Sequence, residues 1–304
     1  MLGPRLLRRS LASLTQKSRA AVLGEPPPDV TISTGHRSVA VVQWLRHRSR
    51  DRLRAIHVGF PRVSPANFDL VVATPQYPVA DHSNLLRIPY AITRAAAGAA
   101  PGIDDDELAN FPAPRRLLMV GGPTLFWDVD RSKVAGVLRR LIDAAGEQGG
   151  SVLVSTSPRT RPKLKATLAS MLSSSNAPNL LAAPGQAPSY GALLAAADSI
   201  HVTADSVAMV SDAIWTGKPI ALVPIAETTI GGALIGVMDR LRPGRPLYPR
   251  DLRRFWKALA GIGVTEKLAT PRRASDEQLC EVVDRARAII NSLVSGENGG
   301  RGKD

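Results

Sequence analysis

Residues 201–224 read HVTADSVAMVSDAIWTGKPIALVP, a pattern that predicts a strand, a turn, a helix and a second strand. Short apolar runs at each end are typical of buried strands, and the residues between them follow helical periodicity. Asp205 and Ser206 stand where the helix should begin, and either could cap it. Gly217 fits the position just past the end of the helix. A strand, a crossover helix and a second strand form the unit of a parallel sheet.

The same alternation of strands and helices extends over most of the chain. Further strands are predicted at 30–34, 55–58, 69–74, 84–89, 117–120, 151–155 and 179–183. An Ala/Gly/Pro-rich stretch with an acidic cluster, 94–114, interrupts the series after four strands and indicates an interdomain connection. We therefore expect an α/β fold of two Rossmann-like domains with mainly parallel sheets. The expected ranges are 1–100 for the N-terminal domain, 115–295 for the C-terminal domain and 296–304 for a disordered tail.

The composition allows a chain of this kind. Its 304 residues suffice for two domains, and 44% of them are hydrophobic although only 4% are aromatic, so we expect aliphatic cores. A single cysteine, Cys280, excludes an intrachain disulfide and fits a reducing compartment. Apolar runs do not reach the ~18 residues that span a bilayer. We expect a cytoplasmic protein, either free or peripheral to a membrane.

The formal net charge of +13 is concentrated near the N-terminus. Residues 1–62 carry twelve Lys and Arg against three acids, an excess of nine positive charges. Such a balance favours acidic partners such as nucleotide phosphates or anionic lipid. Nucleic acid is not expected, because the chain has no RNA-binding signature, zinc-ligand spacing or interleaved aromatic and basic residues. The acid-free residues 1–24 fit either a mitochondrial transit peptide or a basic helix of the first domain; we favour the helix because nothing marks a cleavage site.

Polar residues follow several predicted strands, and ligands of open parallel sheets bind at the carboxyl ends of strands. His36, after the first strand, is a candidate general base or phosphate contact, or a turn residue. Glycines and hydroxyls after two later strands suit a diphosphate, although ordinary turns and helix caps use the same residues. These candidates are Gly121, Gly122, Thr124, Ser155, Thr156 and the cation Arg159. They match neither G-x-G-x-x-G nor a Walker loop.

The stretch 201–224 supplies four more candidates. Asp205 and Ser206 begin the helix, and Asp212 lies one to two turns later, so their side chains could hold a ribose or a sugar by hydrogen bonds. Lys218 closes the helix and could help to hold a diphosphate. Helix capping by Asp205 or Ser206 is the structural alternative for the first two.

Five segments together resemble the mitochondrial-fission family named for the elongated-mitochondria phenotype. They are TISTGHRSVAV (31–41), FDLVVATPQY (68–77), LLMVGGPT (117–124), SVLVSTSPRT (151–160) and VTADSVAMVSDAIWTGKPIALVP (202–224). The resemblance runs from about Asp29 to Leu259. It implies a glycosyltransferase-B-like architecture of two facing domains, in which an acid of the last segment meets a ribose or sugar.

This sequence departs from the family pattern in two places. An earlier strand and a Gly/Asn-rich loop are not evident before Asp29, so we expect a truncated first domain. Asp212 stands where Glu is common, which shortens the side chain by one methylene.

Three functions follow from these observations. The first is a glycosyltransferase-like protein that binds a nucleoside-diphosphate sugar in the interdomain cleft, without a metal or other cofactor and with His36 as base. Its DVD segment, 128–130, precedes a helix and is expected to cap it rather than bind metal. The second is a non-catalytic adaptor that recruits a dynamin-like or membrane partner. The third, an epimerase or other dinucleotide enzyme, is disfavoured by the missing glycine fingerprint and Tyr-x-x-x-Lys pair.

Overall fold

The computed structural model describes residues 9–93, 108–271, 284–285, 287–288 and 291. Most of the predicted connection 94–114 and the whole predicted tail 296–304 lie outside these residues. The chain divides into two compact units, which we call unit 1 and unit 2. Unit 1 holds the described residues up to Pro89, and unit 2 starts at Tyr90.

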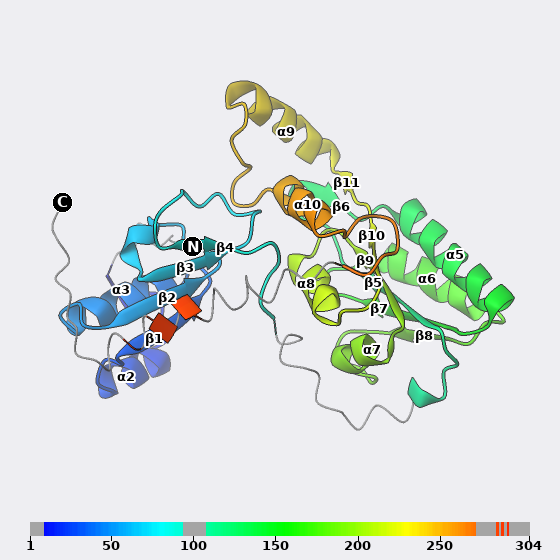
Figure 1. Cartoon of the computed structure of the whole chain (residues 1–304), viewed down its shortest axis with the longest axis horizontal. Coiled ribbons are helices and arrows are strands. Elements are labelled where there is room, and N and C mark those ends of the chain that lie inside the picture. The colour runs from blue at the N-terminus through cyan, green and yellow to red at the C-terminus, as the bar shows by residue number, and fades with distance from the viewer. Residues whose placement is uncertain (1–8, 94–107, 272–283, 286, 289–290, 292–304) are drawn as a thin grey trace. The chain divides into compact units, whose positions relative to one another are not determined.

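Unit 1 is built on a four-stranded parallel sheet (Figure 1). Its strands follow one another across the sheet in chain order: β1 (Val30–Thr34), β2 (Arg54–Val58), β3 (Leu70–Ala73) and β4 (Leu85–Arg87). Its helices are α2 (Gln16–Gly24), α3 (Ser38–Arg48) and the 3-10 turn η1 (Pro65–Asn67). Val39 and Val42 of α3 pack with Leu53, Phe68 and Val71, so the apolar side of the helix covers the sheet.

Unit 1 also includes a short segment from late in the chain, Tyr248–Asp251. The ring of Tyr248 packs edge-on against Phe60 with 5.9 Å between centroids, and the Asp251 amide donates to the Gln76 carbonyl at 2.7 Å. The residues on either side, Leu247 and Leu252, are fully buried in unit 2. This return of the chain to unit 1 was not predicted.

Unit 2 is built on a five-stranded parallel sheet of order β10-β9-β5-β7-β8. The strands are β5 (Arg115–Val120), β7 (Ser151–Thr156), β8 (Asn179–Ala182), β9 (Ser199–Thr203) and β10 (Ile220–Val223). A two-residue antiparallel pair, β6 (Trp127–Asp128) with β11 (Ala226–Glu227), lies beside it. The helices are α5 (Arg131–Gln148), α6 (Pro162–Ser173), α7 (Tyr190–Ala196), α8 (Val207–Trp215), α9 (Thr229–Leu241) and α10 (Leu252–Gly261).

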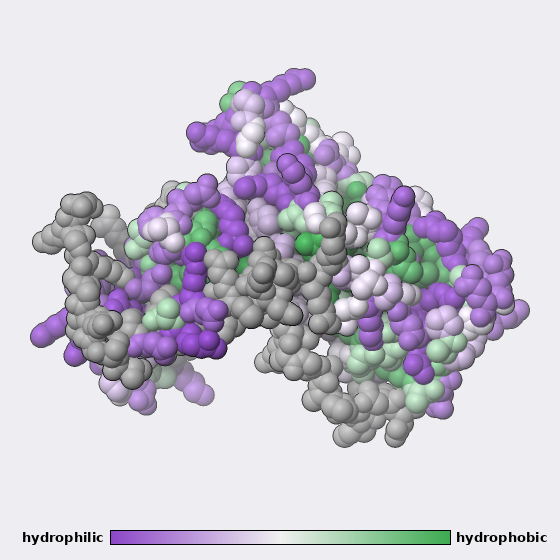
Figure 2. Space-filling model, viewed as in Figure 1, coloured by the Kyte–Doolittle hydropathy of each residue, from purple (hydrophilic) through white to green (hydrophobic). Residues whose placement is uncertain are grey.

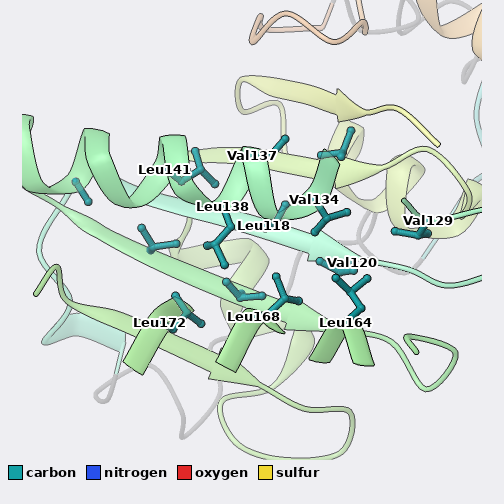
Figure 3. Close-up of a cluster of buried hydrophobic side chains, with 14 residues drawn as sticks. Leu118, Val120, Val129, Val134, Val137, Leu138, Leu141, Leu164, Leu168 and Leu172 are labelled. Carbon is teal, nitrogen blue, oxygen red and sulfur yellow. The ribbon is translucent and has the colours of Figure 1, made fainter. Parts of the chain in front are cut away.

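The main core of unit 2 lies between the sheet and the helices α5 and α6 (Figure 3). Val134, Leu138 and Leu141 recur at helical spacing along α5, and Leu164 and Leu168 do the same along α6. Asp130 fixes the start of α5 by accepting from the amides of residues 132 and 133. As predicted, the DVD segment caps a helix.

The structure confirms the predicted fold class, α/β with two Rossmann-like domains and mainly parallel sheets. All nine predicted strands are present, with ends shifted by one or two residues. Helix α9 and the β6–β11 pair were not predicted.

Candidate functional site

The strand order of unit 2 creates a topological switch point at the carboxyl ends of its strands. The chain runs outward from β5 through β7 to β8, then crosses back to β9 on the other side of β5. Connections after β5 and β9 therefore leave the sheet in opposite directions, with α5 and α6 on one face and α7 and α8 on the other (Figure 1). Open α/β sheets bind ligands at such a switch point, outside the carboxyl ends of the strands. Gly121 and Gly122 follow β5 here, and Asp205 follows β9.

Asp205 lies at this switch point with no solvent exposure. One carboxylate oxygen accepts from the Thr203 hydroxyl at 2.7 Å. The other accepts from the Gly122 amide at 3.0 Å and from Nη2 of Arg159 at 3.1 Å. A buried carboxylate is tolerated only with such compensation. Asp205 thus connects the loops after β5, β7 and β9. We call the residues bonded in this network the Asp205 cluster: Gly121, Gly122, Arg159, Thr203 and Asp205.

The two glycines are required by close packing around this carboxylate. A Cβ at Gly121 would collide with the carboxylate of Asp205, and a Cβ at Gly122 would collide with the main chain of Arg159. Their amides donate within the cluster, from Gly121 to the Thr203 hydroxyl at 2.8 Å and from Gly122 to Asp205. The amides of the two predicted glycines are therefore already engaged by the protein.

Arg159 is the part of the cluster that reaches solvent. Its side chain is 45% exposed, although Nη1 also donates to the carbonyls of Gly122 and Pro123 at 3.3 and 3.2 Å. Three acceptors thus hold the guanidinium in one position. A guanidinium fixed in this way can receive a phosphate with little further loss of side-chain freedom.

The predicted hydroxyls surround the cluster but are largely engaged. Ser155 and Thr156 end β7 and are buried, with the Thr156 hydroxyl 3.5 Å from the Ala182 carbonyl. The Thr124 hydroxyl closes a turn by accepting from the Trp127 amide at 3.3 Å. These residues shape the loops around Arg159.

On α8, the two predicted polar residues have different partners. Ser206 caps the helix by accepting from the Met209 amide, which settles the choice between Asp205 and Ser206 as cap. Asp212 is half-buried and accepts from the Tyr190 hydroxyl at 3.0 Å. Burial and the neighbouring carboxylate raise the pKa of Tyr190 well above its usual range. The Tyr190–Asp212 pair, which joins α7 to α8, was not anticipated because it depends on packing between helices.

Lys218 lies at the other edge of the unit 2 sheet, and His36 belongs to unit 1. Lys218 precedes β10 at the amino edge of the sheet and donates to the carbonyls of Leu194 and Ala195 at the end of α7; burial lowers its pKa. That position, opposite to the carboxyl edge, overturns the expectation that Lys218 helps to hold a diphosphate there. His36 follows β1 in unit 1, and burial together with Arg62 and Arg37 lowers its pKa.

A pocket of about 830 Å³ opens at the carboxyl edge of unit 2, between the starts of α5, α6 and α9. Its polar lining balances three cations against three acids: Arg131, Arg161, Lys163, Asp128, Asp130 and Glu227. Arg161 and Asp128 form an ion pair of 2.7 Å. The sequence did not indicate this pocket because α9, which contributes to its wall, was not predicted.

Within the described ranges, no three His, Cys, Asp or Glu side chains are grouped to hold a metal ion. Over the same residues, no helix combines the length and apolar character needed to cross a membrane.

Comparison with known proteins assigns the chain to a family. The family model described as Mitochondrial fission ELM1 matches residues 2–293. The Mitochondrial fission protein ELM1 of Arabidopsis thaliana is 26% identical over 226 residues, which make up 64% of this chain and 51% of that protein. The matched region thus spans about half the length of this curated relative.

Solved structures give a weaker likeness. The UDP-GlcNAc 2-epimerase of Methanocaldococcus jannaschii has a TM-score of 0.47 at 14% identity, over 88% of this chain and 80% of that one. MurG of Acinetobacter baumannii has a TM-score of 0.42 at 13% identity, over 95% of this chain and 73% of that one.

Proposed function

This chain belongs to the mitochondrial fission ELM1 family, and we propose that it binds a nucleoside-diphosphate sugar through the strand ends of unit 2. The diphosphate contacts the guanidinium of Arg159, and the ribose or sugar lies toward Ser206 and Asp212. The observation that carries this proposal is the state of Arg159, which is held by three acceptors at the switch point while 45% of its side chain is open to solvent.

The chemistry of the residues at the switch point supports a phosphate ligand. Arginine presents several donors in a planar fork that matches phosphate oxygens. Asp205 orients this fork from the buried side, so the guanidinium already has its position before a ligand arrives. Ser206 and Asp212 add hydroxyl and carboxylate oxygens of the kind that bind sugar hydroxyls.

Any sugar transfer by this protein is proposed to be metal-independent, because a fixed cation can neutralise a leaving diphosphate. His36 remains the proposed general base, and its lowered pKa keeps the imidazole neutral and able to accept a proton at pH 7. The test is transfer or hydrolysis of candidate donors with and without a chelator. Inhibition by the chelator contradicts the metal-free reaction, and unchanged turnover in His36→Ala removes His36 from it.

Binding is tested by calorimetry with UDP-, GDP-, ADP- and dTDP-sugars. Charge-assisted hydrogen bonds are worth about 1.5–3 kcal/mol, so Arg159→Lys, which keeps the charge but loses the fork, should weaken binding by about tenfold or more. Arg161→Lys is the matched control, because Arg161 lies nearby but pairs with Asp128. Equal losses in both variants, or no heat with any donor, would refute the proposed site.

A second function is favoured by the family description itself. The matched family and the matched relative are both named for mitochondrial fission. We propose, as the second function, a non-catalytic adaptor that recruits a dynamin-like or membrane partner. The basic residues of 1–62 then serve an acidic surface. Co-sedimentation with anionic vesicles and with a dynamin-like GTPase, in the absence of nucleotide sugar, separates this function from the first.

A further inference from the structure

Helix α9 carries an apolar stripe that faces solvent. Ile230, Leu234, Val237 and Leu241 are 72%, 43%, 52% and 76% exposed, and their spacing of four, three and four residues places them along one side of the helix. We call these four residues the α9 stripe. Figure 2 shows pale and green residues among the purple ones over α9.

The side of α9 that packs on the rest of unit 2 is apolar as well. Gly231 and Ile235 are buried against unit 2, and the sequence contains no charged residue between Glu227 and Asp239. An exposed apolar patch on a folded protein marks an interaction site.

The spacing of the four stripe residues, four, three and four, is the same from either end of the helix. Its midpoint falls between positions 235 and 236, so a second α9 running antiparallel across a twofold axis would match it residue for residue. Ile230 then lies opposite Leu241 of the partner subunit, and Leu234 lies opposite Val237 of the partner subunit. Self-complementarity of this kind is what a twofold contact between identical subunits requires.

Charges at the two ends of α9 agree with the same arrangement. Glu227 precedes the helix, while the exposed Arg242 and Arg245 follow it, and none of the three has a side-chain partner among the described residues. Antiparallel pairing brings Glu227 near Arg242 and Arg245 of the partner subunit, whereas parallel pairing brings like charges together. Opposite charges at matched positions select the register and direction of an interface.

Gly236 is exposed, but helical geometry places it well away from the α9 stripe, so it takes no part in this contact.

We propose that α9 is the contact between two copies of this chain, which associate antiparallel through the α9 stripe. The helix has 13 residues and is about 20 Å long, so the contact is smaller than the ~1,200 Å² of stable interfaces. Association is therefore weak and reversible, and sedimentation should show a mass that rises from 32.3 kDa toward twice that value with concentration.

Charge substitutions test the pairing. Leu234→Asp and Val237→Lys should each weaken association at least tenfold, because each buries a charge opposite an apolar residue. The double variant should recover much of the loss, because position 234 faces position 237 of the partner subunit. Leu268→Asp, at another half-exposed leucine of unit 2, should leave association unchanged. A monomer at all concentrations, or no recovery in the double variant, would overturn the proposal.

Cysteine pairing tests the direction without adding charge. In a Cys280→Ser background, Leu234→Cys mixed with Val237→Cys should give disulfide-linked dimers under mild oxidation. The mismatched mixture of Leu234→Cys with Leu241→Cys should give several-fold fewer. Linkage mainly between like positions would mean a parallel pair and overturn the antiparallel contact. Flotation of a monomeric protein with anionic vesicles, abolished by Leu234→Asp, would assign the stripe to lipid instead.

Discussion

The carboxylate of Asp205 and the guanidinium of Arg159 form a 3.1 Å ion pair in which the anion is fully buried and the cation is 45% exposed. The two partners therefore experience different surroundings. Removal of the arginine charge leaves a buried anion without its counter-ion, whereas a ligand can approach the arginine from solvent while the anion stays in place. The pair joins a structural centre to an accessible cation.

Asp205→Asn should lower the free energy of unfolding by about 1–3 kcal/mol, because an amide oxygen and NH₂ group replace a carboxylate that accepts three hydrogen bonds. Urea denaturation measures the change. Asp128→Asn breaks the more exposed pair with Arg161 and should cost less than about 1 kcal/mol. Equal costs in the two variants would mean that the buried network adds no stability beyond that of a surface pair.

Gly121→Ala should destabilise unit 2 by about 1–3 kcal/mol, because the new methyl group would overlap the Asp205 carboxylate and force the loop to move. Gly146 provides the opposite case. It is exposed within α5 with open space around its Cβ position, so Gly146→Ala should stabilise the protein by about 0.5–1 kcal/mol. Thermal unfolding of both variants checks the signs, and a stabilising Gly121→Ala would contradict the packing described here.

His57 should make stability fall in mild acid. It is fully buried on β2, its Nδ1 lies 3.0 Å from the Ser33 hydroxyl, and burial lowers its pKa to about 4 from the ordinary 6.5. Between these pH values the unfolded chain binds a proton that the folded chain does not, so stability is present above pH 6.5 and declines as the pH falls toward 4. The contribution has an upper limit of about 3 kcal/mol.

Denaturation of His57→Gln at pH 7.5 and pH 5 measures this contribution. The variant should lose less stability between the two pH values than the wild type does. His82→Gln, at an exposed histidine, is the control and should keep the wild-type pH dependence. An unchanged slope in His57→Gln would show that its protonation does not limit stability.

Tyr190→Phe should cost about 0.5–1.5 kcal/mol, because it removes the hydrogen bond to Asp212 and little else. Asp212→Ala should spare the fold to a similar degree, since Asp212 is only half-buried. A double-mutant cycle in urea separates the pair energy from other effects. A coupling energy near zero would mean that the pair does not hold α7 to α8.

The strands could be predicted from sequence because their apolar runs are local signals, as in 117–120 and 219–223. Helix α9 could not, because Gly231, Gly232 and Gly236 lower helix propensity and read as loop. Gly231 is instead required by the nearby main chain of Phe126, a tertiary contact. The candidate site was predicted to lie at the strand ends. Its internal pairing was not, because the Gly121–Thr203 hydrogen bond joins residues 82 positions apart.

The excursion of Tyr248–Asp251 into unit 1 means that no single cut in the gene yields two complete halves. A fragment that ends at residue 93 lacks the aromatic ring that packs on Phe60 and the amide that donates to Gln76. A fragment that starts at residue 90 retains those four residues without their partners. Recombination at the connection between the units would bring residues 248–251 and their partners from different parents, so those contacts would survive only where both parents share them.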